Sequence, residues 1–169
     1  MNRRKTNYFQ LGELTENYKT KKSRKELSKL WNKYIPIFLK YNIPLTIFYG
    51  TLLGYHREQN FIENDDDIDI ILNENYYDKI MEIIKAENLK YWRRNAENRS
   101  FIQLSGCFDI YFYREEDDKI HFDWDSNSFD QKIIFPTKQV YFQNYPIHIP
   151  AEPESFCEMY YGKNWRIPI

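Results

Sequence analysis

The apolar and polar positions of the chain follow a helical period in some segments and a strand period in others. After Ser23 the apolar residues recur at helical spacing, and Ser23 with Glu26 has the form of a capping box, so a helix is predicted to begin there. Pro36 lies inside this pattern and is expected to kink or divide the helix. The residues of its apolar face are Leu27, Leu30, Trp31, Tyr34 and Phe38.

The rest of the chain predicts short strands and two further helices. Strands are predicted at 45–49, 65–72, 92–95, 101–104, 107–112 and 119–124, and short strands or extended segments at 132–136, 139–142 and 146–149. Helices are predicted at 73–85 and 153–161. Residues 23–169 contain no repeat and no linker, which indicates one domain. Residues 1–22 are basic and predict a partly ordered arm, or alternatively a contact with an anionic membrane or glycan carrier.

Four carboxylates stand within five residues at 65–69, and two of them alternate with isoleucines. In a strand, Asp67 and Asp69 point to one face while the isoleucines point to the other. Two carboxylates about 7 Å apart on one face can bind a single divalent cation, which would also relieve their repulsion. Asp65 and Asp66 are expected to cap the segment or to add hydrogen bonds around the ligands.

Asp109 stands alone inside a second apolar strand, where a buried carboxylate is costly unless it is paired or metal-bound. If this strand lies beside the first acidic one, Asp109 becomes the third carboxylate of the same site. Gly50 and Thr51 follow the first predicted strand, where a close backbone approach and free N–H groups would suit a phosphate. Arg57 is expected to bind a phosphate or carboxylate, the alternative being a surface ion pair or a helix cap.

Composition narrows the class of protein. The 169 residues carry a formal net charge of -1, so a global basic field for nucleic acid is absent. Cys107 and Cys157 are expected to be buried thiols, because their spacing does not resemble a zinc site. No secretory signal and no apolar run of about 20 residues is present, which predicts a cytoplasmic or peripherally membrane-attached protein. Arg93, Arg94 and Arg99 are expected to form a solvated hairpin or to bind an anionic substrate.

One stretch, residues 50–70, reads GTLLGYHREQNFIENDDDIDI. It closely resembles, without a gap, the signature of the LicD/fukutin-related family, GTLLGAxRxxGFIPWDDDIDI. The family's later pattern is matched in order by Phe108-Asp109-Ile110, Phe135-Pro136, Val140-Tyr141-Phe142, Ile149-Pro150, Tyr161-Gly162 and Trp165. The departures, Tyr55, Asn60 and Glu63-Asn64, change the loop before the acids and leave the acids in place, so they bear on substrate identity.

The resemblance implies an α+β, nucleotidyltransferase-like fold, with a mixed β-sheet, flanking helices and acids on adjacent strands. It implies a phosphotransferase that moves phosphocholine, ribitol phosphate or glycerol phosphate from a CDP-linked donor to a glycan or glycolipid hydroxyl, releasing CMP. Asp67, Asp69 and Asp109 would be the catalytic, metal-binding residues for Mg²⁺ or Mn²⁺. Gly50, Thr51 and Arg57 would bind the donor. The alternatives are nucleotidyl transfer from an NTP and a catalytically inactive binding module.

Overall fold

The computed structural model describes residues 7–10, 13–16 and 20–168. The first two segments are strands β1 (Asn7–Gln10) and β2 (Glu13–Glu16), which pair antiparallel. Both fall within the basic arm predicted at 1–22. Residues 1–6, 11–12 and 17–19 of that arm lie outside the described residues, so the arm stays a prediction.

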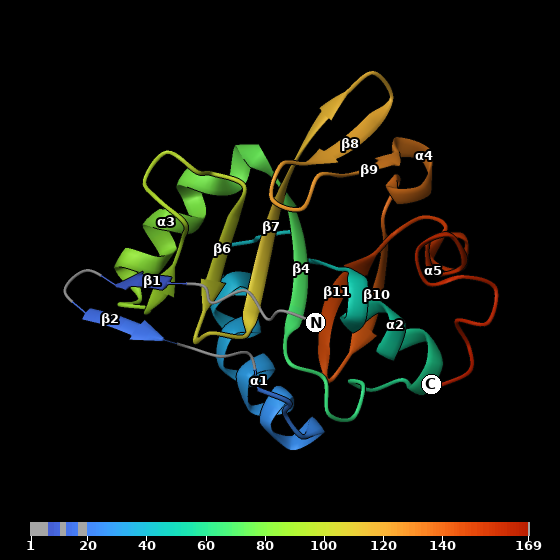
Figure 1. The fold of residues 1–169 in the computed structure, drawn as a ribbon, viewed down its shortest axis with the longest axis horizontal. Helices are drawn as coiled ribbons and strands as arrows, with labels where there is room; N and C mark the ends of the chain where they lie inside the picture. The colour runs from blue at the N-terminus through green and yellow to red at the C-terminus, as the bar shows by residue number, and fades with distance from the viewer. Residues whose placement is uncertain (1–6, 11–12, 17–19, 169) are drawn as a thin grey trace.

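Within the described residues, the main sheet has nine strands in the order β10-β11-β3-β4-β7-β6-β5, and β8 and β9 extend from β7 (Figure 1). Strand pairs β4–β7 and β11–β3 are parallel and the others are antiparallel, which confirms the predicted mixed sheet. The strands are β3 (Thr46–Ile47), β4 (Ile68–Asn73), β5 (Tyr91–Trp92), β6 (Phe101–Leu104), β7 (Phe108–Glu116), β8 (Lys119–Phe122), β9 (Asn127–Asp130), β10 (Lys138–Phe142) and β11 (Tyr145–Ile149).

Helices flank the sheet, and two of them cover the same face of β7. The helices of the described residues are α1 (Arg24–Lys40), α2 (Tyr49–Glu58), α3 (Tyr77–Ala86), α4 (Gln131–Ile134) and α5 (Pro153–Tyr161), and α3 follows the 3₁₀ turn η1 (Glu74–Tyr76). The two that cover β7 are α1 and α3. The ring of Tyr34 in α1 lies 5.1 Å from that of Phe108, and the ring of Tyr77 in α3 lies 5.1 Å from that of Phe112. Because side chains alternate along a strand, Asp109 points to the opposite face, away from α1 and α3.

Helix α1 begins as predicted and is not divided by its proline. The Ser23 hydroxyl accepts from the Glu26 N–H, and the Glu26 carboxylate accepts from the Ser23 N–H, which completes the capping box. Pro36 was expected to kink or divide the helix, and because it lies within one continuous helix, the division is ruled out. Ile35 and Phe38 are fully buried on either side of it, and their packing offsets the missing backbone hydrogen bond.

The other corrections concern short segments. The strand predicted at 45–49 is only β3, because the chain turns at Tyr49, whose φ is 39°, and enters α2. The extended segment predicted at 132–136 contains the short helix α4, and the strand predicted at 92–95 ends at Trp92. Strand β9 was not predicted, since its sequence NSFD carries a single apolar residue and pairs only with β8.

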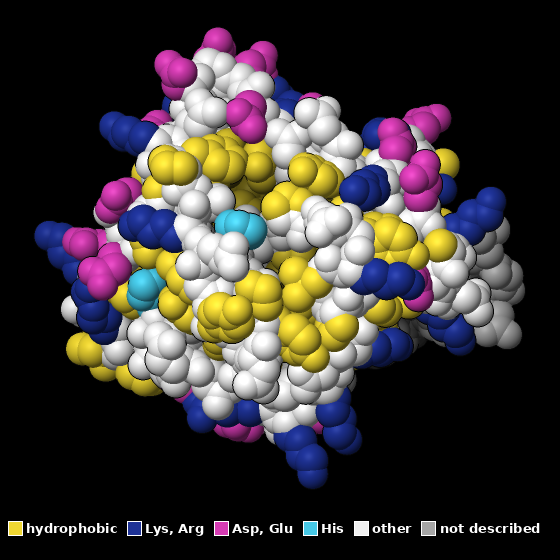
Figure 2. Space-filling model, turned by 180° about the vertical axis from the view of Figure 1, so that it is seen from behind, with side chains coloured by type: hydrophobic (Ala, Val, Ile, Leu, Met, Phe, Trp, Pro, Cys, Tyr) yellow, Lys and Arg dark blue, Asp and Glu magenta, His cyan; other side chains and the backbone are white. Residues whose placement is uncertain are grey.

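The surface carries charges of both signs. Seen from behind, apolar side chains occupy the centre of the face, and Lys and Arg are interspersed with Asp and Glu around its rim (Figure 2). Cys107 and Cys157 are buried thiols, as predicted. No helix among the described residues has the length and apolarity that a bilayer crossing requires.

Candidate active site

Three buried aspartates converge on the face of the sheet that α1 and α3 leave open. Strands β4 and β7 run parallel, and their register places Asp69 directly beside Asp109. Asp67 lies just before β4 on the same face. Each of the three offers a carboxylate oxygen, and these oxygens all lie within 4.8 Å of one another. Asp67, Asp69 and Asp109 are only 8%, 4% and 0% exposed, so the acids predicted from the sequence share one shielded cluster.

A second group of acids overlaps the first at Asp67. Asp65, Asp66 and Asp67 also bring carboxylate oxygens within 4.8 Å of one another, but Asp65 and Asp66 are partly exposed. The loop is held at its backbone, because the Lys22 N–H donates to the Asp65 carbonyl at 2.7 Å. The Asp66 N–H donates to Oδ1 of Asp65 at 3.0 Å. Asp65 and Asp66 therefore add negative charge on the more exposed side of the acid cluster.

The first turn of α2 holds Asp69 from two directions. The Gly50 N–H donates to Asp69 Oδ2 at 3.0 Å, and the Asp69 N–H donates to Thr51 Oγ1 at 2.9 Å. A Cβ at Gly50 would lie 2.9 Å from Asp65 Oδ2 and 3.3 Å from Asp69 Oδ2. Gly50 and Thr51 were predicted to bind a phosphate, but in the structure both form hydrogen bonds with Asp69. A phosphate would have to share the Gly50 N–H with Asp69. The Thr51 side chain is buried, which removes its hydroxyl from solvent.

Arg57 occupies a separate position near the end of α2. Its guanidinium Nη2 lies 3.8 Å from Glu58 Oε1, and its side chain is only 10% exposed. Its Nε is buried and has no hydrogen-bond partner among the described residues. Arg24, which the sequence interpretation overlooked, donates from Nε to the Phe61 carbonyl at 2.8 Å and pairs with Glu58. Arg24 therefore ties the start of α1 to the loop that precedes the acids.

Gln103 is a second residue of the site that the sequence interpretation missed. It lies on β6 directly opposite Asp109, and its Nε2 donates to Asp109 Oδ1 at 2.7 Å. Gln103 is 2% exposed. The sequence signal for Gln103 is of the same kind as the signal for Asp109, namely a polar residue inside an apolar run. For Gln103 that run is Phe101-Ile102-Gln103-Leu104.

Tyrosines form the wall beside the acids. Burial raises the pKa of Tyr111 well above its usual value, and the charges of Asp69, Asp109 and Asp67 raise it further. The Tyr49 ring lies 5.4 Å from that of Tyr111 and 5.1 Å from that of Tyr160. Because burial, followed by nearby negative charge, also raises the pKa of Tyr160, these hydroxyls stay neutral at physiological pH and can donate hydrogen bonds.

The composition of the cluster suits a hard divalent cation. Three carboxylates supply oxygen ligands only, which is the ligand type that Mg²⁺ and Mn²⁺ prefer. Carboxylates held this close in a buried place repel one another unless a proton or a cation compensates them. Asp67, Asp69 and Asp109 therefore fit the cation that the sequence predicted.

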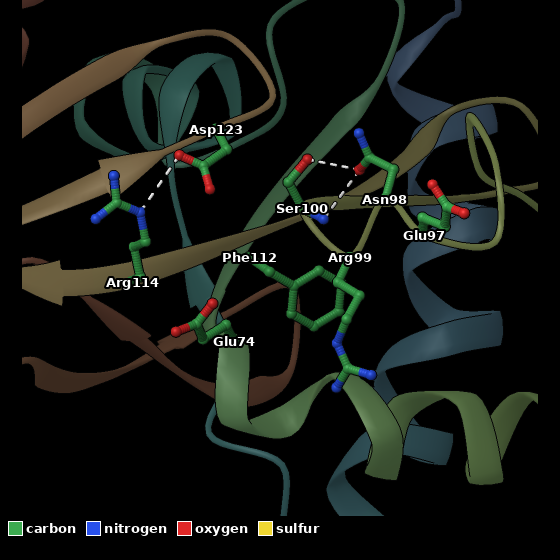
Figure 3. A pocket seen from close by; sticks show the side chains of 8 residues that line it. All are labelled: Glu74, Glu97, Asn98, Arg99, Ser100, Phe112, Arg114 and Asp123. Atoms are coloured by element: carbon green, nitrogen blue, oxygen red, sulfur yellow. Dashed lines mark hydrogen bonds and ion pairs between the residues drawn. The ribbon is translucent and has the colours of Figure 1, made fainter.

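The predicted arginine cluster does not form one anion site. Arg99 pairs with Asp78 at 2.9 Å, Arg94 stacks 4.5 Å from the Trp124 ring centre, and Arg93 donates to the Tyr77 hydroxyl at 3.2 Å. Arg99 also borders a cavity of about 290 Å³ (Figure 3). Phe112 lines this cavity and, by strand alternation, points away from the face of Asp109, so the cavity is distinct from the acid cluster.

Comparison with known protein families gives one match that covers most of the chain. Residues 42–152 match the family model described as LicD/FKTN/FKRP, nucleotidyltransferase domain. The matched range contains α2, Asp67, β4, β7 and Gln103, and so every residue of the acid cluster.

Individual relatives agree with this match. The ribitol-5-phosphate transferase FKTN of Homo sapiens is 27% identical over 164 residues, which cover 88% of this chain and 34% of that protein. The protein of the same name from Mus musculus is 26% identical over the same shares. An uncharacterized protein of Rickettsia typhi is 32% identical over 69% of this chain and 39% of its own length. The chain thus spans about a third of the length of the FKTN proteins it matches.

Proposed function

Because the chain belongs to the LicD/FKTN/FKRP nucleotidyltransferase-domain family, we propose that it is a metal-dependent phosphotransferase. It moves a phospho-alcohol group, such as phosphocholine, ribitol phosphate or glycerol phosphate, from a CDP-linked donor to a hydroxyl of a glycan or glycolipid. The observation that carries this proposal is the buried cluster of Asp67, Asp69 and Asp109 beside the first turn of α2. The similarity to ribitol-5-phosphate transferases supports the choice of donor class.

Asp67, Asp69 and Asp109 would hold one or two Mg²⁺ or Mn²⁺ ions. When bound, the cation neutralises charge on the diphosphate of the donor. The Gly50 N–H and the Thr51 hydroxyl keep Asp69 in place, and the absence of a side chain at Gly50 lets the carboxylates of Asp65 and Asp69 lie close to the first turn of α2. The proposed role of Arg57 is to bind the phosphates of the donor, because a guanidinium can pair with phosphate oxygens.

The reaction is a displacement at the phosphorus that bears the alcohol. The acceptor hydroxyl oxygen forms the new P–O bond, the bond to the bridging oxygen breaks, and CMP leaves with that oxygen. Asp109 accepts the proton of the attacking hydroxyl. We propose that the protein is cytoplasmic or peripherally attached to a membrane, and that nucleic acid is not among its partners.

The test is product analysis with purified protein and Mn²⁺. Incubation with CDP-choline, CDP-ribitol or CDP-glycerol and a glycan acceptor is expected to release CMP, whereas nucleotidyl transfer from ATP or CTP would release pyrophosphate. Asp109→Asn is expected to abolish CMP release while part of the donor binding survives. Asp117→Asn, at an exposed hairpin turn, is the matched control and should be fully active. Pyrophosphate as the only product would refute phospho-alcohol transfer, and absence of both products together with absence of Mn²⁺ binding would favour an inactive module.

A further inference from the structure

Tyr111 stands next to the acid cluster on the same face of the sheet. It lies two residues after Asp109 on β7, so both side chains point away from the face that α1 and α3 cover. Its ring is held from two sides. The ring centre of Phe101, its partner on β6, lies 5.0 Å away, and that of Tyr49, in the first turn of α2, lies 5.4 Å away. Packing against both neighbours therefore fixes the phenol beside the acids.

The hydroxyl of Tyr111 has no hydrogen-bond partner among the described residues. Tyr111 is only 9% exposed, yet its hydroxyl is not one of the partnerless polar atoms that are sealed from solvent. It therefore borders space that water can reach. The hydroxyl of the neighbouring Tyr49, by contrast, donates to Asp125 at 2.8 Å. Burial, followed by the charges of the three clustered acids, raises the pKa of Tyr111, which agrees with a position close to all three.

A diphosphate bound at the acid cluster needs hydrogen-bond donors that the acids cannot supply. Carboxylates offer only acceptors. The Gly50 N–H already donates to Asp69, and the Thr51 side chain is buried. The phenol O–H of Tyr111 is a donor on the face of the acids, and a tyrosine side chain extends further from the sheet than an aspartate side chain does. It can therefore reach past the carboxylates to a group that a cation holds on them.

We infer that Tyr111 is a substrate-binding residue, whose hydroxyl donates a hydrogen bond to an oxygen of the phosphoryl group that is transferred. This group must lie beside Asp109, because the attacking hydroxyl gives its proton to that residue. Tyr111 is the next side chain of β7 on the same face, about 7 Å along the strand. The inference rests on the proposed function, but it does not depend on which alcohol the phosphoryl group carries.

The test compares the binding of CDP and of CMP in the presence of Mn²⁺, because CDP contains the phosphate that is transferred and CMP lacks it. Tyr111→Phe removes the hydroxyl and keeps the ring. Calorimetry is expected to show CDP binding weakened by about 10–100-fold, since a hydrogen bond to a charged group is lost, and CMP binding unchanged. Tyr113→Phe is the matched control. It lies on the same strand and face and is also buried, and it should change neither affinity.

Three further measurements separate this contact from a structural role. The Mn²⁺ affinity and the melting temperature of Tyr111→Phe should equal those of the wild type, because the phenol is not a ligand of the cation. Wild-type affinity for CDP in Tyr111→Phe would overturn the inference alone. An equal loss of CDP and CMP binding, or a loss of Mn²⁺ affinity, would assign the residue to the shape of the site and would also overturn it. Failure of the wild-type protein to bind CDP with Mn²⁺ would overturn the proposed function as well, so the two failures are distinguishable.

Discussion

Replacing Gly50 with alanine tests whether this glycine is required for the geometry of the acid cluster or for the stability of helix α2. The new Cβ would lie 2.9 Å from Asp65 Oδ2, so that carboxylate must move by about 0.5 Å to reach an ordinary contact. The contact to Asp69 Oδ2, at 3.3 Å, is also tight, and Asp69 is buried and held by the Gly50 N–H. We expect Mn²⁺ binding to weaken by about tenfold, because ligand sites tolerate displacements of only about 0.5 Å.

The same substitution should not weaken the fold. Gly50 lies inside α2, where alanine is favoured over glycine by up to about 1 kcal/mol, so the melting temperature should stay or rise by about 2–4 °C. Calorimetric titration with Mn²⁺ and thermal melting of the metal-free protein measure the two effects separately. Wild-type Mn²⁺ affinity in a folded Gly50→Ala protein would refute the reasoning.

Gly54 in the same helix provides the matched control. A Cβ there would lie 2.5 Å from the Asn60 carbonyl oxygen and 3.0 Å from the Ile62 nitrogen, and backbone atoms cannot move aside as a carboxylate can. Gly54→Ala is therefore expected to destabilise the protein by about 1–3 kcal/mol, while the folded fraction keeps its Mn²⁺ affinity. If the two variants gave the same profile, the assignment of separate roles to the two glycines would be wrong.

Three further predictions concern the fold. Ser23→Ala removes the capping box and should lower the free energy of unfolding by about 1 kcal/mol in urea, whereas Ser23→Asp should not. Burial lowers the pKa of His56 in the folded protein, so the unfolded chain binds a proton at higher pH than the folded protein does. The free energy of unfolding should therefore fall as the pH decreases from about 7 to 5, and it should fall less in His56→Gln than in the wild type. Burial raises the pKa of Cys157 to about 12, and Cys107 is also buried, so neither thiol should react with a disulfide reagent at about pH 8 before urea is added. Labelling of either thiol in the native protein would contradict the last prediction.

Two of the three acids could be predicted from the sequence because they contradict their surroundings. Asp69 and Asp109 stand in apolar strands, and an ionisable residue in such a place requires a compensating partner. The sequence could not show that β4 and β7 run parallel with Asp69 beside Asp109, because pairing between distant segments is not encoded in local periodicity. It was the family resemblance that suggested neighbouring strands.

The residues that support the acids were harder to predict. Gln103 is also a polar residue in an apolar strand, but an uncharged amide in a strand is weaker evidence of a functional site than a carboxylate is. The contact of Gly50 with Asp69 depends on the turn at Tyr49, where a left-handed backbone ends the strand and starts α2. Tyrosine rarely adopts that conformation, so the sequence indicated a longer strand.

The acid cluster forms only when β4 and β7 pair in their native register. If β7 slipped by one residue, Asp109 would turn to the face that α1 and α3 cover, and a phenylalanine or isoleucine would take its place. Such a misaligned molecule could keep most of its secondary structure and still lack a third ligand. If the cluster binds a cation as proposed, binding requires β4 and β7 to pair in this register, so cation occupancy would distinguish native molecules from near-native ones.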